Sequence, residues 1–304
     1  MWTLRGGLAL VLPVVLLLGG CARRPSGVDG DLTDDWPAMP AATLLVPADQ
    51  ACYLLSSPYR PNFAQRRPTV DCATAHNLET VHVGTFTGAD ADRGDLPPAG
   101  GTAMRTAYGV CDKAVRDFLG GDWRAARLEL VVTLPYPPAW SAGARWYRCD
   151  LLAYEDTYYQ STLATPQRSL RGELTGPREY VLGCAAIKAS APAYDIGSFL
   201  QTDCGQPHNA EFAGVWDAPD GPYPARDDRA FNERMYRGCS AVIAAYVSIA
   251  DVNAAYEHGD MWGFPFNKDE WAGGNRGYRC CWWTEKGQVT RSLKGVGTKG
   301  MPGL

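Results

Sequence analysis

The chain has 304 residues, 46% of them hydrophobic and 20% charged, which is a globular composition with room for two domains of ordinary size. Its 29 Lys and Arg residues against 33 Asp and Glu residues give a net charge of −4, so no basic surface predicts nucleic-acid binding. Ten cysteines with 33 Gly and 22 Pro indicate a loop-rich chain held by disulfides in an oxidising compartment, and they exclude disordered, collagen-like and multi-span membrane proteins.

Residues 1–20 have the proportions of a secretory signal peptide. An apolar run from Leu8 to Leu18 is shorter than the roughly 20 residues that a membrane-spanning helix needs. The run ends in the string LGGC, which resembles the lipobox of bacterial lipoproteins, so we expect its cysteine, Cys21, to be acylated and to anchor the protein in the lipid bilayer. The alternative is an ordinary secretory signal with Cys21 near the cut by chance. Residues 21–43 are rich in Pro, Gly and Asp and read as a tether.

An internal repeat organises the rest of the chain. Three strings occur twice in the same order: DCATAHNLE at 71–79 and DCGQPHNAE at 203–211, WSAGARWYRC at 140–149 and WAGGNRGYRC at 271–280, and RSLRG at 168–172 and RSLKG at 291–295. A repeat of this length is the size of a small domain. We therefore predict two homologous domains, residues 44–172 and 173–304.

Each predicted domain holds four cysteines and one amphipathic helix. The cysteines are Cys52, Cys72, Cys111 and Cys149 in the first domain, and Cys184, Cys204, Cys239 and Cys280 in the second. Apolar residues recur at helical spacing over 104–118 and 231–246, which places the third cysteine of each domain on the inner face of a helix. The stretch 80–86 alternates like a strand. The fold class is therefore α+β: two tandem disulfide-stapled domains, each a small antiparallel sheet with one packed helix.

The disulfide pairing stays open on the sequence, because four cysteines allow three connectivities. We favour helix-to-sheet bridges between the second and third cysteines, with the first and fourth joining outer strands. The favoured bridges are Cys72–Cys111, Cys52–Cys149, Cys204–Cys239 and Cys184–Cys280. Cys281 is left over as an odd thiol, for which a buried, inert position is favoured over an intermolecular bridge.

The repeated C-x₃-H-x₂-E and W-x-x-G-x-R-x-x-x-C strings resemble those of the septum formation family of actinobacterial extracytoplasmic proteins. The resemblance implies a membrane-anchored protein or lipoprotein linked to cell division and envelope growth, and it implies no known reaction. Two departures from the family pattern stand out. Ala75 replaces the usual proline before the first histidine, and Ala144 and Asn275 replace the aspartate that usually precedes the arginine.

The repeated histidines and glutamates are the sharpest polar features. His76 with Glu79, and His208 with Glu211, could bind zinc or act as acid–base pairs. The interpretation that we favour is structural: each histidine hydrogen-bonds the turn after a disulfide cysteine, and each glutamate pairs with the arginine of the W-x-x-G-x-R string. This predicts the two contacts Glu79–Arg145 and Glu211–Arg276. The H-E-x-x-H string of common zinc proteases is absent.

Taken together, these features predict a non-catalytic binding or scaffold lipoprotein on the outer face of the cell membrane, with a role in septum formation or envelope growth. We expect no catalytic residue, no metal and no cofactor. The expected partners are the bilayer, through acylated Cys21, and envelope or division proteins, with no nucleic acid. The alternative is an envelope enzyme or metal-binding protein that uses the repeated His/Glu pairs.

Overall fold

The computed structural model describes residues 44–55, 63–64, 68–155, 162–190, 195–225, 228–252, 260–264 and 268–302. Residues 44–304 form one compact unit. The predicted signal peptide, the lipidation residue Cys21 and the tether at 21–43 lie outside the described residues. Among the helices that the structure describes, none combines the length and the apolar character needed to cross a bilayer.

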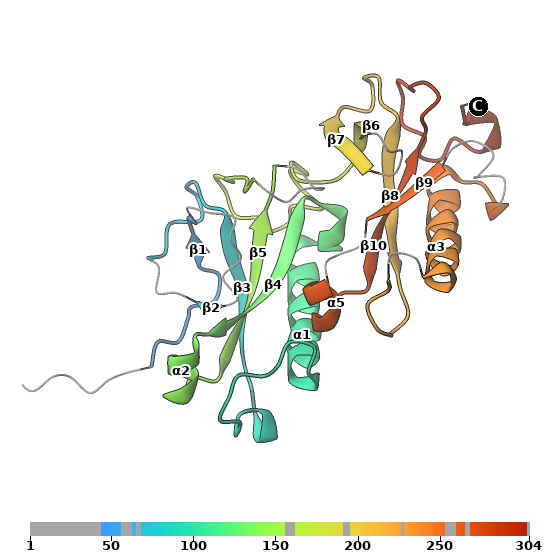
Figure 1. Cartoon of the computed structure of the whole chain (residues 1–304). Helices are drawn as coiled ribbons and strands as arrows, with labels where there is room; N and C mark the ends of the chain where they lie inside the picture. Colours follow the sequence, from blue (N-terminus) through green and yellow to red (C-terminus); the bar gives the residue numbers. More distant parts are fainter. Residues whose placement is uncertain are drawn as a thin grey trace, which may run out of the picture. The chain divides into compact units, whose positions relative to one another are not determined.

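The first half of the unit is a five-stranded sheet with one long helix packed against it (Figure 1). The strand order is β1-β3-β5-β4-β2, and every pairing is antiparallel except the parallel one between β2 and β4. The elements are β1 (Cys52–Tyr53), β2 (Phe63–Ala64), β3 (Leu78–Thr85), α1 (Thr102–Leu119), β4 (Leu128–Pro135), α2 (Pro137–Ser141) and β5 (Trp146–Ala153).

The second half is built in the same way (Figure 1). Its sheet has the strand order β7-β6-β8-β10-β9, and all of its pairings are antiparallel. The elements are β6 (Cys184–Ser190), β7 (Asp195–Thr202), β8 (Ala210–Asp217), α3 (Arg229–Val247), β9 (Asp260–Phe264), α5 (Lys268–Gly273) and β10 (Gly277–Trp283). The order β6-β8-β10-β9 repeats β1-β3-β5-β4, so the predicted α+β fold of two tandem homologous domains is confirmed.

The long helices form where the apolar spacing predicts them. Cys111 and Leu119 are both fully buried on the face of α1 that packs on the sheet. Gly120 ends α1 with a φ of 79°, a left-handed conformation that glycine adopts without strain. Asp228 begins α3 by accepting a hydrogen bond of 2.9 Å from the backbone N–H of Phe231, which satisfies one of the free donors of the first turn.

All eight cysteines of the repeat are in disulfides, and the favoured pairing is wrong. None of the four predicted bridges, Cys72–Cys111, Cys52–Cys149, Cys204–Cys239 and Cys184–Cys280, is present. The bridges in the structure are Cys52–Cys72, Cys111–Cys149, Cys184–Cys204 and Cys239–Cys280. In each half one bridge therefore joins the first strand of that half, β1 or β6, to the turn before β3 or β8. The other joins the long helix, α1 or α3, to the interior strand β5 or β10. The ninth described cysteine, Cys281, is a buried free thiol.

Strand register explains the difference. Cys52 pairs with Glu79 in β3 and also forms a bridge with the backbone at Val70, two residues before Cys72. This arrangement brings the first two cysteines together at the edge of the sheet. Cys149 lies within the central strand β5, which is buried along its whole length against α1. Cys149 is therefore the cysteine that faces Cys111 across the core.

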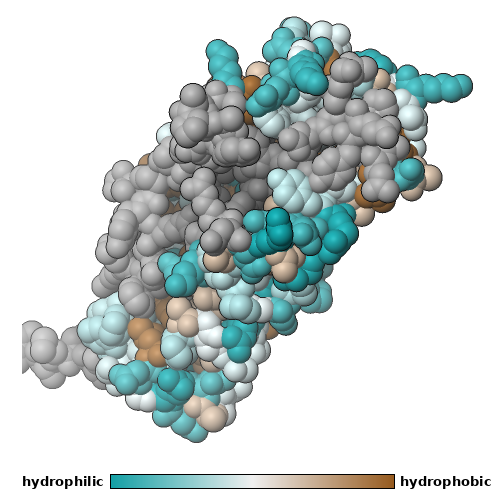
Figure 2. Space-filling model, turned by 45° about the vertical axis from the view of Figure 1, so that its right-hand side comes forward, coloured by the Kyte–Doolittle hydropathy of each residue, from teal (hydrophilic) through white to brown (hydrophobic). Residues whose placement is uncertain are grey.

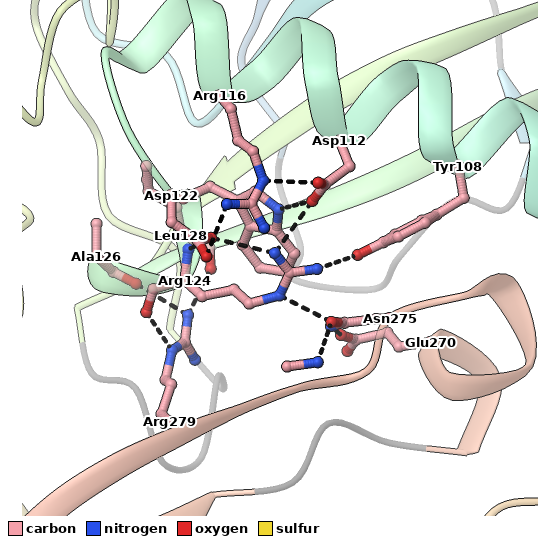
Figure 3. Close-up of polar contacts among 12 residues, drawn as sticks. Tyr108, Asp112, Arg116, Asp122, Arg124, Ala126, Leu128, Glu270, Asn275 and Arg279 are labelled. Atoms are coloured by element: carbon pink, nitrogen blue, oxygen red, sulfur yellow. Dashed lines mark hydrogen bonds and ion pairs between the residues drawn. The ribbon is translucent and has the colours of Figure 1, made fainter. Parts of the chain in front are cut away.

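The two halves are joined by buried arginines (Figure 3). Arg124, in the short 3-10 turn η2 (Trp123–Ala125), donates from Nε to Asn275 Oδ1 at 2.8 Å and from Nη2 to the Tyr108 hydroxyl at 2.7 Å. Arg279, in β10, donates to three backbone carbonyls of the first half, those of Arg124 at 2.8 Å, Ala126 at 2.9 Å and Leu128 at 3.0 Å. Charge-assisted hydrogen bonds of this kind fix the junction within the compact unit.

The segment between the halves packs on the first one. Leu174 and Tyr180 belong to the core cluster of α1 and β4. The backbone of Arg127 donates to the carbonyl of Tyr180 at 2.8 Å, and that of Leu182 donates to the carbonyl of Ala125 at 2.9 Å. The division of the chain at residue 172 stays a prediction.

Candidate functional site

Each half contains a buried histidine just before its third strand, β3 or β8. The Nδ1 atom of His76 lies 2.7 Å from the carbonyl oxygen of Thr74, and that of His208 lies 2.8 Å from the carbonyl oxygen of Gln206. Because a carbonyl oxygen only accepts, Nδ1 carries the hydrogen in both rings. The other ring nitrogen, Nε2, is therefore the atom that faces the glutamate three residues later.

The two histidine–glutamate pairs differ in their spacing. In the second half, His208 Nε2 lies 2.9 Å from Glu211 Oε1, and both side chains are fully buried. In the first half, His76 Nε2 lies 3.9 Å from Glu79 Oε2 and has no hydrogen-bond partner among the described residues. The second pair is thus a closed hydrogen bond, whereas the first is an open charge pair.

Each glutamate accepts hydrogen bonds from the third repeated string of its half, RSLRG or RSLKG. Glu79 accepts a hydrogen bond of 2.6 Å from the Ser169 hydroxyl and one of 2.8 Å from the backbone N–H of Leu170. Leu170 is 1% exposed, so the hydrogen bond to its backbone N–H helps to position its side chain in the core. A buried carboxylate is stable only when donors replace its lost water, and the closing string supplies them.

In the second half, Glu211 accepts the equivalent hydrogen bonds and one more from an additional donor. Glu211 accepts from the Ser292 hydroxyl at 3.1 Å, from the backbone N–H of Leu293 at 2.8 Å and from the Tyr246 hydroxyl at 2.8 Å. Tyr246 lies seven residues after Cys239 in α3, and Phe118 holds the equivalent place after Cys111 in α1. Phenylalanine has no hydroxyl, so Glu79 lacks this donor.

Burial disfavours the charged form of His76, but the Glu79 carboxylate and the Thr74 carbonyl stabilise that form more strongly, and the pKa of His76 is raised above its ordinary value. Glu79 and Thr74 thus favour the imidazolium in the interior. A buried ion pair of this type is costly to break from one side, because the remaining charge is left uncompensated.

The predicted glutamate–arginine contacts are wrong: Glu79 does not contact Arg145, and Glu211 does not contact Arg276. Instead, the W-x-x-G-x-R string folds on itself. The guanidinium of Arg145 lies 4.3 Å from the ring centre of Trp140 and donates to the Trp140 carbonyl at 2.6 Å. That of Arg276 lies 4.4 Å from the ring centre of its own string's tryptophan and donates to the carbonyl of the same residue.

The glycine of that string allows the turn. Gly143 has a φ of 103° and Gly274 a φ of 119°, where a side chain would be strained. With the glycine in this conformation, the arginine doubles back over the indole ring and gains a cation–π contact. The string therefore forms a turn stabilised by its own residues, and it leads into β5 in the first half and into β10 in the second.

Asparagines at repeated positions are structural residues that the sequence analysis missed. Asn77 Oδ1 accepts from the backbone N–H of Leu55 at 2.7 Å, and its Nδ2 donates to the carbonyl of the same residue at 2.9 Å. Asn209 bonds both backbone groups of Ile187 in the same manner, at 2.7 and 3.0 Å. Their recurrence beside each histidine was the available signal.

The repeated cluster also has the composition of a metal site. Ligand atoms of Cys52, His76 and Glu79 lie within 4.8 Å of one another, and those of Cys184, His208 and Glu211 do the same. Zinc binds thiolate, imidazole and carboxylate. Both cysteines are in disulfides, however, and a disulfide sulfur is no thiolate. The oxidised protein therefore offers only the histidine and the glutamate.

Fold and site together define a class: a duplicated, disulfide-stapled α+β protein in which the repeated polar residues hold the architecture. The chain belongs to the septum formation family, whose model matches residues 51–280. The match covers more than half of the chain and extends into both halves, so the resemblance seen in the sequence is confirmed. No curated protein and no solved structure matches the chain significantly.

Proposed function

We propose that the protein is a membrane-anchored lipoprotein on the outer face of the cell membrane, where it serves septum formation or envelope growth as a non-catalytic binding or scaffold protein. Membership of the septum formation family supports the cellular process. One observation supports the non-catalytic role: the repeated polar side chains are used to hold the fold. Glu79 and Glu211 accept hydrogen bonds from the RSLRG and RSLKG strings. Arg145 and Arg276 donate to the tryptophan carbonyls of their own W-x-x-G-x-R strings.

The described surface fits a protein that works through contacts with partners. Apart from the consecutive residues 44–46, the exposed large apolar side chains lie singly along the chain, and the coloured residues in Figure 2 are mostly hydrophilic. Those of the second half are Leu200, Tyr223 and Tyr236. Tyrosine is enriched where proteins meet, because its ring is apolar and its hydroxyl is polar.

Acylation is tested by feeding cells a palmitate analogue and comparing the chain with its Cys21→Ser variant. We expect the wild-type chain to carry the label and to sediment with membranes, and the variant to lose both. A Cys281→Ser variant is the matched control, since it removes another unpaired cysteine and is expected to keep the label. A label that survives in Cys21→Ser would contradict the anchor.

The scaffold role is tested in cells depleted of the protein, by counting septa per unit of cell length after rescue. A His208→Ala variant that retains the thermal stability of the wild type is expected to restore septa fully. Photo-crosslinkers placed at the exposed Tyr223 and Tyr236 are expected to capture the same envelope or division proteins in independent experiments. A stable His208→Ala protein that fails to rescue would instead favour the alternative, an envelope enzyme or metal-binding protein that uses the repeated His/Glu pairs.

A further inference from the structure

The cluster of the first half is the starting point. One sulfur, one imidazole nitrogen and one carboxylate oxygen, from Cys52, His76 and Glu79, all lie within 4.8 Å of one another in a buried place. Bonds from zinc to nitrogen or oxygen are about 2.0–2.2 Å long, so one ion can span the 3.9 Å between His76 Nε2 and Glu79 Oε2.

The imidazole of this cluster is prepared for a ligand. His76 is 0% exposed, and its Nε2 is a buried nitrogen without a hydrogen-bond partner among the described residues. Its Nδ1 donates to the carbonyl of Thr74 at 2.7 Å. Histidines that bind metals usually donate their second nitrogen to a carbonyl or carboxylate, which fixes the ring and leaves the first nitrogen directed at the ion.

The glutamate of the first half has acceptor capacity left. An ionised carboxylate offers about four acceptor positions. Glu79 uses two of them, for Ser169 and Leu170. In the second half Glu211 serves four donors, which are His208, Tyr246, Ser292 and Leu293. The first cluster is therefore open to a cation, whereas the second is closed by its own hydrogen bonds.

The disulfide keeps the sulfur of Cys52 from serving as a ligand in the first cluster. Cys52 is fully buried, but its partner Cys72 is half-buried and lies in an exposed turn next to Ala73 and Thr74. A dithiol protein can attack the bond from that side. The dithiol gives two electrons and two protons, becomes a disulfide itself and leaves Cys52 and Cys72 as thiols. Binding of a zinc ion then releases the proton of the coordinating Cys52 thiol and the Nε2 proton of the His76 imidazolium.

We propose that reduction of the Cys52–Cys72 disulfide turns the first half into a zinc site, with Cys52 Sγ, His76 Nε2 and a carboxylate oxygen of Glu79 as ligands and Cys72 beside them. The site is independent of the scaffold role proposed above, and it assigns no metal to the oxidised protein. Whether this site in the first half holds zinc would thus depend on the thiol–disulfide balance of the protein's compartment.

The test uses Cys72→Ser, which frees the Cys52 thiol while the other three bridges stay closed. The purified chain is titrated with Co²⁺, whose spectrum reports thiolate ligation in the near ultraviolet and tetrahedral geometry in the visible. We expect one cobalt ion per chain with both signatures, displaced by Zn²⁺, and neither signature in the oxidised wild type. Adding His76→Ala to this variant is expected to weaken cobalt binding more than about tenfold.

The matched control is Cys204→Ser, which frees Cys184 in the closed second cluster and is expected to bind cobalt at least about tenfold more weakly. No thiolate band in Cys72→Ser, or an unchanged band after His76→Ala, would overturn the proposal. If Cys72→Ser does not fold, mildly reduced wild-type protein is alkylated with and without Zn²⁺. Protection of Cys52 then supports the site, and equal labelling refutes it.

Discussion

At the scale of single residues, the buried glutamates have the same task but different surroundings. Replacing Glu211 by glutamine places an amide N–H₂ among donors that need an acceptor, and it removes the negative charge beside His208. We expect Glu211→Gln to lower the free energy of unfolding by about 3–5 kcal/mol. The equivalent Glu79→Gln change should cost less, about 1–3 kcal/mol, since fewer donors are lost.

Urea denaturation of the two variants, followed by tryptophan fluorescence, measures this difference. Tyr246→Phe is an informative control because it removes a single donor from Glu211 and reproduces the surroundings of Glu79, where Phe118 stands. Its expected cost is about 1 kcal/mol. Equal losses in Glu79→Gln and Glu211→Gln would show that the number of donors does not set the contribution of these glutamates.

Asp112 gives the protein an acid-sensitive contact. Burial disfavours its carboxylate, but Arg124, Trp123 and Arg116 stabilise the charge more strongly, so the pKa of Asp112 is lowered below its ordinary value of 3.8. A carboxyl whose pKa is lower in the folded state stabilises the fold above its unfolded pKa. The stabilisation is lost as the pH falls through the folded pKa.

We therefore expect Asp112→Asn to be less stable than the wild type by a constant amount above about pH 5, with a gap that narrows as the pH falls below about 4. Melting temperatures measured from pH 7 to pH 2.5 give the two curves. The exposed Asp117, paired with Lys113 on the same helix, is the control, and Asp117→Asn should follow the wild type closely. A gap that widens on acidification would reverse the sign argued here.

At the scale of elements, the four bridges divide into two kinds by position. Cys72 and Cys204 are half-buried in turns, whereas Cys111, Cys149, Cys239 and Cys280 are completely buried between helix and sheet. A thiolate must reach a sulfur to reduce a disulfide. We expect mild dithiol treatment under native conditions to open Cys52–Cys72 and Cys184–Cys204 first, as read by alkylation and peptide mass spectrometry.

The inner bridges, Cys111–Cys149 and Cys239–Cys280, should open only under conditions that unfold the chain. They close loops of 38 and 41 residues, against 20 for each outer bridge, and loops of such lengths give about 3–4 kcal/mol of stabilisation each in a chain-entropy account. Simultaneous reduction of all four bridges in native buffer would mean that exposure does not control their reactivity.

Much of the element structure could be predicted from the sequence, because periodicity is local information. The helix around Cys111, its end at Gly120 and the strand before Phe86 follow from spacing and stop signals. The disulfide pairing did not follow, because it depends on the register that places Cys52 beside Val70. Register is set by the whole sheet rather than by any one string.

The site was predicted in its residues but not in its contacts. Repetition identified the histidines, glutamates and arginines, yet it could not show which string each would touch. Glu79 bonds the RSLRG string and Arg145 bonds its own tryptophan, Trp140. The RSLRG string and Trp140 both belong to repeated strings. The sequence therefore identified these residues as important but did not show which of them would contact each other.

At the scale of the whole molecule, Arg279 couples the halves together with Arg124. Asp150 of the first sheet is fully buried and pairs with Arg148, and Cys281 occupies the equivalent position beside Arg279. Arg279 instead bonds three carbonyls across the junction, and burial lowers its pKa to about 10. The first half has an internal ion pair where the second half has an inter-domain contact.

We expect Arg279→Met to lower stability by about 2–4 kcal/mol, because it leaves buried carbonyls at Arg124, Ala126 and Leu128 without these donors. It should also split the single melting transition into two, which scanning calorimetry detects. The control is Arg105→Ala, whose side chain is on the exposed surface of α1. One sharp transition in Arg279→Met, at the wild-type temperature, would show that the halves are coupled elsewhere.

The grip of Glu79 on Leu170 also sets an order of events while the chain is being made or exported from its N-terminus. The first half can seat its last leucine and the segment up to Leu182 before β6 has emerged, so it matures without the second half. The carbonyls of Ala126 and Leu128 receive a donor from Arg279 only when the chain is 153 and 151 residues longer, respectively. In a chain that ends before β10, these two carbonyls would lack the hydrogen-bond donor that Arg279 supplies.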